Sequence, residues 1–543
     1  MKTFKGISVF SGVAIGPLHF YRRETQSIER REIQDPQAEI ARFEAARQEA
    51  IKKLGELHDK TLADVGEANA AIFEIHQMML DDLDYIESVR GIITAQNVAA
   101  EYAVSATAEN FEKMFSSMDD AYMRGRAADV KDVSERVLSI LSPVKRCSLN
   151  ADVPSIIASD DLAPSETVQL DKSKVLGFVT AEGSTTSHTS ILARTIGIPA
   201  VIGAGDGLTA DIDGKQGILD GFTGTLYVEP DEETAAAMKK KQDEYLHERA
   251  LLEELKGKPN ITIDGRRVQV FANVTSIDDL GSVIKNDAEG IGLFRSEFIY
   301  MGSSSYPTVD EQFAIYKRAL ESMGAKKVVI RTLDIGADKQ AAYFDLPHEQ
   351  NPAMGMRAIR ICLERPELFK TQLKALYMAS VFGNLSIMFP MITSTWEVEE
   401  AFRIAAQARD ELARANVPFR SDVETGIMVE TPAAVMMSRE LADLVDFFSV
   451  GSNDLTQYTL AVDRQNQKIS RFFDPRHPAV LRMIKMAADN AHAAGKWIGI
   501  CGELGADTAL TEEFLRYGID EISVSASSVL RVRKKVRSLD LSK

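Results

Sequence analysis

The fold is indicated most clearly by residues 447–454, which read Phe447-Phe448-Ser449-Val450-Gly451-Ser452-Asn453-Asp454. Four mainly apolar residues, typical of a buried strand, lead directly into a glycine and a polar turn. The same pattern, an apolar run followed by polar or charged residues, recurs through the second half of the chain. The runs are Val268–Val274, Gly290–Phe294, Val328–Leu333, Ser386–Phe389, Gly426–Val429, Phe447–Val450, Trp497–Cys501 and Glu521–Val524.

These eight runs predict a (β/α)8 barrel over residues 260–543, because long helical segments separate most of them. The active site of such a barrel lies at the C-terminal ends of its strands. Charged residues, which a core would exclude, follow the runs at several of these ends. They occur in Arg295-Ser296-Glu297, Arg331-Thr332-Leu333-Asp334, Glu430-Thr431-Pro432, Gly451-Ser452-Asn453-Asp454 and Cys501-Gly502-Glu503. The pattern predicts a single site for a polyanionic ligand.

The residue types at these ends suit phosphate chemistry. Arg295 and Arg331 stand at the ends of neighbouring strands and present the planar fork that binds phosphate or carboxylate oxygens, and Arg464 is a third candidate. Glu430 and Asp454 match the one or two carboxylates by which proteins hold Mg²⁺ beside substrate oxygens. The alternative is a pair of helix caps or salt-bridge partners, and the nearby arginines favour the metal.

Cys501 ends the seventh run. A cysteine is most often a small buried hydrophobe. At the presumed active face, however, a thiol with an ordinary pKa stays protonated near neutral pH and is able to deliver a proton.

A second candidate site precedes the barrel, where residues 186–190 read Thr186-Ser187-His188-Thr189-Ser190 before an apparent helix start. A helix N-terminus offers unpaired N–H groups and the positive end of its dipole to an anion. Neutral imidazole is a nucleophile near neutral pH. Local sequence alone favours a phosphate-carrying His188 no more than an ordinary helix cap beside a surface histidine.

The first 260 residues show a different pattern of predicted strands and helices from the barrel region. Short strands over residues 1–20 and alternating strands and helices over 144–230 predict one α/β domain. Apolar residues at helical spacing predict a helical subdomain over 21–143, inserted into that domain. Residues 231–259 predict a linker helix, for which an ordinary surface helix and a hinge between moving halves are equally good interpretations.

Composition limits the function further. The chain has 543 residues, 45% of them hydrophobic, which predicts three or four domains with sizeable cores. Its net charge of -17 disfavours a nucleic-acid partner. Three widely spaced cysteines predict a reducing compartment, and we found no apolar run of about 18 residues. We therefore expect a cytoplasmic protein without a signal peptide or membrane span.

Several motifs resemble the phosphoenolpyruvate-utilising enzymes, above all the enzyme I family of the sugar phosphotransferase system. Gly183-Ser184-Thr185-Thr186-Ser187-His188 is similar to the phosphohistidine motif of these enzymes, except that Ser184 stands where a second glycine is usual. Residues 351–360 and 447–458 are similar to two signatures of the barrel, and the segment 331–339 fits as well. The resemblance covers nearly the whole chain.

This resemblance implies that the protein transfers the phosphoryl group of phosphoenolpyruvate to His188 and then to a histidine of the carrier protein HPr, releasing pyruvate. The fold it implies is a swivelling phosphohistidine α/β domain with an inserted helical subdomain, followed by a (β/α)8 barrel. The implied roles are phosphoryl acceptor for His188; proton donor to the enolate for Cys501; substrate binding for Arg295, Arg331, Arg357, Asn453 and Arg464; Mg²⁺ binding for Glu430 and Asp454; phosphoryl orientation for Thr167 and Arg194; and carrier docking for Glu67, His76, Asp82, Asp84 and Arg126.

Two other kinds of protein share part of this sequence pattern. Pyruvate phosphate dikinase and phosphoenolpyruvate synthase share the histidine and barrel domains but also need an ATP-binding domain, in place of which this chain has a helical insertion. A regulatory relative without turnover is disfavoured because His188, the arginines and Cys501 are all present. A homodimer through the barrel is expected from the family, although the chain ends soon after its eighth strand. The identity of the carrier, and a sugar-transport or regulatory pathway, stay open; the lack of a separate N-terminal sensory domain favours sugar transport.

Overall fold

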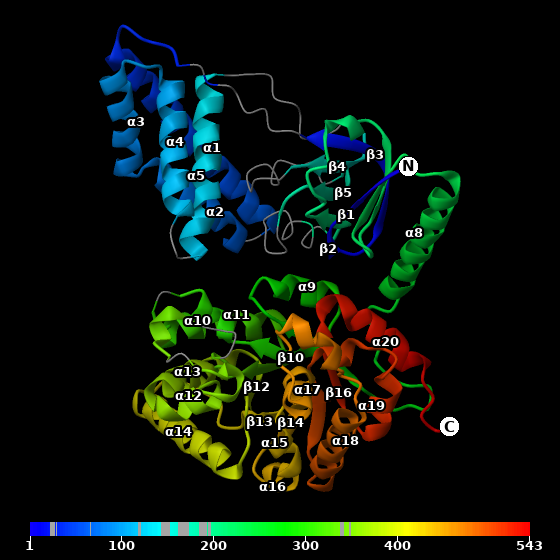
Figure 1. The fold of residues 1–543 in the computed structure, drawn as a ribbon. Coiled ribbons are helices and arrows are strands. Elements are labelled where there is room, and N and C mark those ends of the chain that lie inside the picture. The colour runs from blue at the N-terminus through cyan, green and yellow to red at the C-terminus, as the bar shows by residue number, and fades with distance from the viewer. Residues whose placement is uncertain are drawn as a thin grey trace. The chain divides into compact units, whose positions relative to one another are not determined.

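The computed structural model describes residues 1–21, 28, 30–65, 67–117, 121–142, 153–160, 173–183, 193, 197–303, 305–336, 341–346 and 349–543. It divides into two compact units, Met1–Glu248 and Arg249–Lys543 (Figure 1). The first unit contains an α/β domain and a helical subdomain, and the second is a barrel.

The α/β domain is built on a mixed eight-stranded sheet with the order β1-β8-β7-β3-β4-β5-β6-β2. The long strand β3 joins its two halves, because it pairs antiparallel with β7 and parallel with β4. The N-terminal strands therefore belong to the same sheet as those that follow the helical insertion, as predicted. The strands are β1 Lys2–Lys5, β2 Ile7–Phe10, β3 Val13–Tyr21, β4 Ser155–Ser159, β5 Val175–Thr180, β6 Ala200–Ile202, β7 Gln216–Asp220 and β8 Thr225–Val228.

The helical subdomain leaves the sheet after β3 and returns to it at β4. Its helices are α1 Pro36–Val65, α2 Glu67–Leu80, α3 Leu83–Gln96, α4 Ala100–Ser116 and α5 Ala121–Leu141. α1 packs against α2 and α4 packs against α5. Apolar residues at helical spacing, such as Phe43, Phe73 and Val137, form a separate core for this subdomain. The predicted helical insertion is confirmed.

The predicted linker is the helix α8, Glu232–Glu253, which has no buried residue. Lys241 Nζ lies 2.7 Å from Asp220 Oδ2, and Gln242 Nε2 donates a hydrogen bond of 2.9 Å to the Val13 carbonyl. These contacts attach α8 to the sheet of the first unit. The boundary between the units, at Glu248 and Arg249, falls inside the helix.

The second unit is a closed barrel of eight parallel strands, in the order β9 to β16 around the ring. Each strand coincides with one of the eight predicted runs, with ends that differ by at most two residues. The strands are β9 Gln269–Val274, β10 Gly290–Arg295, β11 Lys327–Arg331, β12 Asn384–Phe389, β13 Glu424–Val429, β14 Phe447–Val450, β15 Trp497–Ile500 and β16 Glu521–Ser525.

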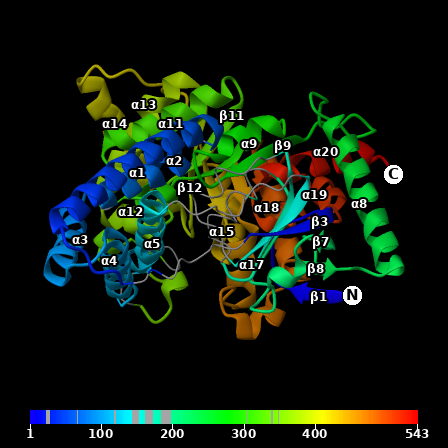
Figure 2. The same ribbon diagram turned by 90° about the horizontal axis from the view of Figure 1, so that it is seen from above.

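Helices surround these strands, as the view in Figure 2 also shows. The α-helices are α9 Asp279–Lys285, α10 Glu297–Met301, α11 Val309–Met323, α12 Ile359–Glu364, α13 Pro366–Ala379, α14 Thr395–Arg414, α15 Pro432–Met436, α16 Ser438–Ala442, α17 Ser452–Leu460, α18 Pro478–Ala493, α19 Thr511–Tyr517 and α20 Val529–Ser538. Short 3₁₀ helices occur at Ala210–Ile212, Ala342–Phe344, Pro352–Met354, Ser380–Phe382, Gln467–Phe472, Glu503–Ala506 and Ala526–Ser528.

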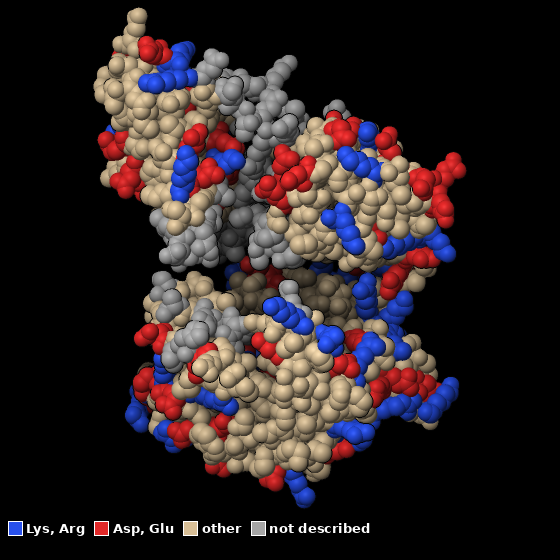
Figure 3. Space-filling model, viewed as in Figure 1, with Lys and Arg blue, Asp and Glu red and all other residues tan. Residues whose placement is uncertain are grey.

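Side chains fill the barrel interior, including Leu293, Val329, Met388, Met428 and Phe447. A parallel barrel of this kind presents all C-terminal strand ends on one face, which leaves the polar residues after the strands to form a site there. On the faces visible in Figure 3, acidic and basic side chains are interspersed. Among the helices that the structure describes, none has the length and apolar character needed to cross a membrane.

Candidate active site

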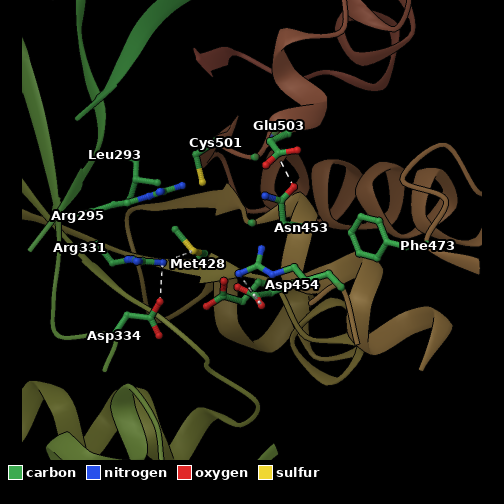
Figure 4. Close-up of a pocket in the computed structure, with 14 residues that line it drawn as sticks. Leu293, Arg295, Arg331, Asp334, Met428, Asn453, Asp454, Phe473, Cys501 and Glu503 are labelled. Atoms are coloured by element: carbon green, nitrogen blue, oxygen red, sulfur yellow. Dashed lines mark hydrogen bonds and ion pairs between the residues drawn. The ribbon is translucent and has the colours of Figure 1, made fainter. Parts of the chain in front are cut away.

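A cavity of about 430 Å³ opens at the C-terminal ends of the barrel strands (Figure 4). It collects side chains from β10, β11 and β13 and from the segments that follow β11, β13, β14 and β15. The residues that line it are Leu293, Arg295, Arg331, Asp334, Met428, Glu430, Gly451, Asn453, Asp454, Arg464, Phe473, Cys501, Gly502 and Glu503. This mixture of arginines, carboxylates and a thiol has the composition predicted for a polyanion site.

Two arginines from adjacent strands enter the cavity in different states. Arg331, at the end of β11, is held by Glu297 Oε1 at 2.6 Å from Nη2 and by Asp334 Oδ2 at 3.0 Å from Nη1. Arg295, at the end of β10, has no hydrogen bond or ion pair within the described part of the chain. The Arg295 guanidinium is therefore available to an anion, whereas that of Arg331 is fixed in orientation.

Arg357 lies behind the cavity wall and is almost fully buried. Its Nη2 is 2.9 Å from Asp334 Oδ1, and its Nη1 is 3.6 Å from Asp454 Oδ1. Nη1 also donates a hydrogen bond of 3.1 Å to the Tyr458 hydroxyl. Arg357 was predicted to bind the substrate, and two carboxylates that it contacts, Asp334 and Asp454, line the cavity. Its predicted role stays a prediction.

Glu430, directly after β13, and Asp454, in the first turn of α17 after β14, form the acidic side of the cavity. Glu430 Oε1 accepts a hydrogen bond of 2.6 Å from the Met391 N–H, which orients the carboxylate. Glu430 Oε2 and Asp454 Oδ1 are both buried, and neither has a hydrogen-bond partner among the described residues. Two buried acceptor oxygens without a donor are the groups that a hard divalent cation would satisfy.

The electrostatics of this pair support the same interpretation. Burial raises the pKa of Glu430 to about 8, and the nearby Asp454 and Asp334 carboxylates raise it as well. The backbone approaches the Glu430 carboxylate closely, because a Cβ on Gly451 would lie 2.7 Å from Glu430 Oε2. A bound cation would favour the ionised form of a carboxyl whose ionisation burial and acidic neighbours oppose, which fits the predicted Mg²⁺ site.

Asn453 and Arg464 complete the polar wall. Asn453 Oδ1 accepts a hydrogen bond of 3.4 Å from the Glu503 N–H. The Asn453 side-chain amide group therefore keeps donors for a ligand oxygen. Arg464 Nη2 lies 3.9 Å from Asp454 Oδ1, and the arginine side chain is 29% exposed. Both residues occupy positions suited to binding a small anion.

The thiol of Cys501 faces the same cavity from the end of β15 (Figure 4). It is 3% exposed, and Sγ lies 3.5 Å from the Val450 carbonyl, to which it is able to donate its hydrogen. Burial raises the pKa of the Cys501 thiol to about 12. The sulfur thus carries a proton across the physiological pH range, as a proton donor must.

The structure brings together seven of the predicted site residues around one cavity: Arg295, Arg331, Glu430, Asn453, Asp454, Arg464 and Cys501. His188, Thr167 and Arg194 lie outside the described residues. Their predicted roles stay predictions.

The predicted docking residues lie on the helical subdomain. Asp82 and Asp84 are exposed, and the Asp82 carboxylate caps α3 by accepting a hydrogen bond of 2.8 Å from the Asp84 N–H. Glu67 begins α2, and its side chain is not among those described. Arg126 is partly buried on α5. His76 is 0% exposed, so in this structure it offers no surface to a partner and direct docking through it is not supported.

Glu297 and Asp334, the carboxylates that hold Arg331, were not among the predicted site residues. Both stand three residues or fewer beyond an arginine at a strand end, in Arg295-Ser296-Glu297 and Arg331-Thr332-Leu333-Asp334. The proximity of acid and base at a strand end was the available signal. It does not reveal that Glu297 pairs with the arginine of the next strand, which only the barrel brings within 2.6 Å.

Comparison with known proteins is consistent with this site. Three family descriptions match the chain: "PEP-utilising enzyme, N-terminal" over residues 5–126, "PEP-utilising enzyme, mobile domain" over 151–224 and "PEP-utilising enzyme, PEP-binding domain" over 249–541. Phosphoenolpyruvate-protein phosphotransferases from Bacillus sp. (strain S) and Geobacillus stearothermophilus are each 44% identical over 543 residues, covering 99% of this chain and 93% of theirs. The one from Bacillus subtilis (strain 168) is 40% identical over 547 residues, covering 99% of this chain and 95% of its own.

Proposed function

Because this chain belongs to the phosphoenolpyruvate-utilising enzymes, among the phosphoenolpyruvate-protein phosphotransferases, we propose that it moves the phosphoryl group of phosphoenolpyruvate to its own His188 and then to a histidine of HPr, releasing pyruvate. This is the first step of the sugar phosphotransferase system. The observation that carries the proposal is the convergence of arginines, two donor-free carboxylate oxygens and a protonated thiol on one cavity.

Phosphoenolpyruvate carries a phosphate and a carboxylate, and the cavity provides cationic groups for both. Arg295, Arg331 and Arg464 are able to bind these oxygens with paired, charge-assisted hydrogen bonds, and the Asn453 amide adds a neutral donor. Phosphoryl transfer depends mainly on positioning and charge stabilisation. Glu297 and Asp334 contribute by holding the Arg331 guanidinium in place before the substrate arrives.

Glu430 and Asp454 would hold Mg²⁺. The chemistry that this ion supplies when bound is positive charge beside the transferring phosphoryl group. The protein itself contributes the fixed orientation of Glu430, through the Met391 N–H. It also buries Glu430 Oε2 and Asp454 Oδ1, neither of which accepts a hydrogen bond from the described residues.

The reaction balances with the residues named. A ring nitrogen of His188 forms a bond to phosphorus as the P–O bond of phosphoenolpyruvate breaks, and the electron pair stays on the enolate oxygen. The enolate carbon then takes the proton of the Cys501 thiol, which gives pyruvate. The resulting thiolate regains a proton from solvent. A thiol with a raised pKa suits this step because it holds its proton until the carbanion-like carbon develops.

In the second half of the reaction, phosphorylated His188 meets the carrier. The proposed docking surface is on the helical subdomain, around Glu67, Asp82, Asp84 and Arg126. Thr167 and Arg194 are proposed to orient the phosphoryl group at His188. We further propose a cytoplasmic protein that forms a homodimer through the barrel, in line with the family resemblance.

The relay is tested by incubating the protein with labelled phosphoenolpyruvate, Mg²⁺ and purified HPr, and by following label on HPr. The intact protein should label HPr with release of an equal amount of pyruvate. His188→Ala should label neither protein, while Cys501→Ala should release pyruvate far more slowly. Transfer to HPr that persists in His188→Ala would refute the proposed phosphohistidine relay.

A further inference from the structure

A histidine is completely buried in the helical subdomain, far along the chain from the active-site cavity. His76 lies on α2 with 0% exposure, and its ring packs edge-on against Phe73 at a centroid distance of 6.2 Å. Its two nitrogens face two carboxylates of α5. Nε2 lies 3.3 Å from Asp129 Oδ1, and Nδ1 lies 3.6 Å from Asp132 Oδ2. The ring is thus fixed between two acidic groups.

Asp129 connects this buried histidine to the arginine predicted to dock the carrier. Its second oxygen, Oδ2, accepts a hydrogen bond of 3.0 Å from Arg126 Nη1. The Arg126 side chain remains 15% exposed, compared with 12% for Asp129 and 0% for His76. The three side chains form a chain of contacts that begins in the subdomain core and ends at its surface.

Asp129 is suited to link His76 to Arg126, because its carboxyl group contacts both side chains. Burial alone would raise the pKa of its carboxyl, but the hydrogen bonds and charges of His76 and Arg126 outweigh burial and hold it below the usual value. The group is therefore a carboxylate with both oxygens engaged. A carboxylate fixed at one oxygen by a buried ring restricts the guanidinium bound to the other.

We propose that His76 is a positioning residue for carrier docking, which fixes Asp129 through Nε2 and thereby holds the Arg126 guanidinium in the orientation that binds an acceptor oxygen on the carrier. This inference rests on the proposed function, since it requires that the helical subdomain binds HPr through Arg126. It replaces the predicted direct contact between His76 and the carrier, which burial of the ring does not support.

A matched pair of substitutions tests the inference. A glutamine amide nitrogen falls near the position of Nε2, whereas an asparagine amide nitrogen falls near that of Nδ1. His76→Gln should therefore keep the contact with Asp129, and His76→Asn should lose it. With HPr titrated against the whole protein, we expect His76→Asn to raise the Kd by about tenfold and His76→Gln to leave it within about threefold, as for loss of one hydrogen bond to a charged group.

Further measurements separate positioning from mere structural support. Both variants should keep the circular dichroism of the helices and should become labelled by phosphoenolpyruvate at the normal rate. In an Arg126→Met background, His76→Asn should not weaken HPr binding further. Equal Kd values for the two single variants, or additive effects of the Asn and Met substitutions, would overturn the inference. So would unchanged HPr affinity in Arg126→Met with normal phosphoryl transfer, which leaves the proposed function standing. Failure of phosphoenolpyruvate to label the unsubstituted protein would count against the proposed function itself.

Discussion

At the scale of single residues, the two arginines of the cavity have different tasks because they have different partners. Arg331 is held on both sides by carboxylates of the protein, and Arg295 has no partner among the described residues. A cation without an internal partner gains most when an anionic ligand arrives. Arg295 should therefore contribute more directly to substrate affinity, and Arg331 to the geometry of the site.

Substitution of Arg295 by methionine should raise the KM for phosphoenolpyruvate by about tenfold to a hundredfold, the range expected for loss of a charged hydrogen bond. Steady-state kinetics at saturating HPr measure the change. Arg403→Met is the matched control, since Arg403 is an exposed residue of α14 that pairs with Glu400. An unchanged KM in Arg295→Met would show that Arg295 does not contribute to substrate binding.

Cys501→Ala should leave the affinity for phosphoenolpyruvate within about threefold of the intact protein and slow pyruvate formation by about 10²–10⁴-fold, the usual contribution of a general acid. Because the pKa of the thiol is raised to about 12, it stays protonated as pH rises from 6 to 10. The intact enzyme should accordingly show no loss of activity from Cys501 ionisation in that interval. A rate profile that falls near pH 8.5 in the intact protein, but not in Cys501→Ala, would contradict this assignment.

The sequence predicts these residues because strand ends of a parallel barrel must converge. Arg295 and Glu430 each follow an apolar run and Cys501 ends one, and the closed barrel brings them to one cavity. The partners of Arg331 could not be predicted in this way. Glu297 reaches it at 2.6 Å from the start of α10, which follows the preceding strand, and Asp334 reaches it at 3.0 Å from the loop after β11. Such pairings depend on side-chain directions that spacing alone does not specify.

At the scale of elements, β16 begins with an unusual buried acid. Glu521 is 1% exposed, and its Oε1 has no hydrogen-bond partner within the part of the chain that the structure describes. Two glycines make room for it: a Cβ on Gly292 would lie 2.5 Å from Oε1, and a Cβ on Gly499 would lie 2.0 Å from Oε2. Burial raises its pKa well above the usual value, although Lys327 partly offsets the rise.

This burial predicts a pH-dependent stability of the barrel. An unfolded glutamate has a pKa near 4.3, so the folded state binds its proton more tightly. The stabilisation is complete below that value and is lost as pH rises through the raised folded pKa, by up to about 1.4 kcal/mol per pH unit. We expect the free energy of unfolding to fall as pH rises above about 5, and to fall less in Glu521→Gln.

Tryptophan fluorescence during urea unfolding measures this prediction in the barrel alone. The chain has two tryptophans, and both Trp396 and Trp497 lie in the second unit. Glu430, whose pKa is also raised, is present in both proteins and therefore does not distort their difference. Parallel pH curves for the intact protein and Glu521→Gln would show that Glu521 is ionised in the folded barrel.

The strands of the barrel were predicted well from sequence. Short apolar runs that are separated by long helical segments are typical of buried strands. The run Glu521–Val524 was recognised as a strand even though it begins with an acid. The burial of that acid was not predicted. A glutamate at the start of a strand is usually solvated, and only the neighbouring glycines of β10 and β15 reveal the space it occupies.

At the scale of the whole molecule, the sequence predicts the order of the parts, and the fold class is confirmed. The boundary between the two units falls between Glu248 and Arg249, within α8. The C-terminal part of the linker region is hydrogen-bonded to the barrel, because Arg533 Nη1 donates a hydrogen bond of 3.0 Å to the Leu255 carbonyl. The candidate hinge Gly257-Lys258-Pro259 is also hydrogen-bonded to the barrel. The Gly257 N–H donates a hydrogen bond of 2.7 Å to Asp287 Oδ2.

The chain forms two compact units, and the cavity lies in the barrel. We therefore expect the substrate to stabilise only the barrel. In the His188→Ala variant, which cannot be phosphorylated there, phosphoenolpyruvate with Mg²⁺ at a hundred times its Kd should stabilise the barrel by about 2.7 kcal/mol. This corresponds to a rise in Tm of about 4–5 °C for a unit of this size. Calorimetry should show the barrel transition rising and the transition of residues 1–248 unchanged. Removal of Mg²⁺ with a chelator should reverse much of the shift, and equal shifts of both transitions would contradict the assignment of the site to the barrel alone.

The central claim, that the barrel cavity phosphorylates His188 from phosphoenolpyruvate, is tested most directly without any carrier. The protein is incubated with labelled phosphoenolpyruvate and Mg²⁺, and acid-labile phosphate on the protein is compared with pyruvate released, for the intact chain and for His188→Ala. We predict one phosphate bound per pyruvate in the intact protein and neither product in the variant. Absence of label on the folded intact protein, or equal label on His188→Ala, would contradict the account.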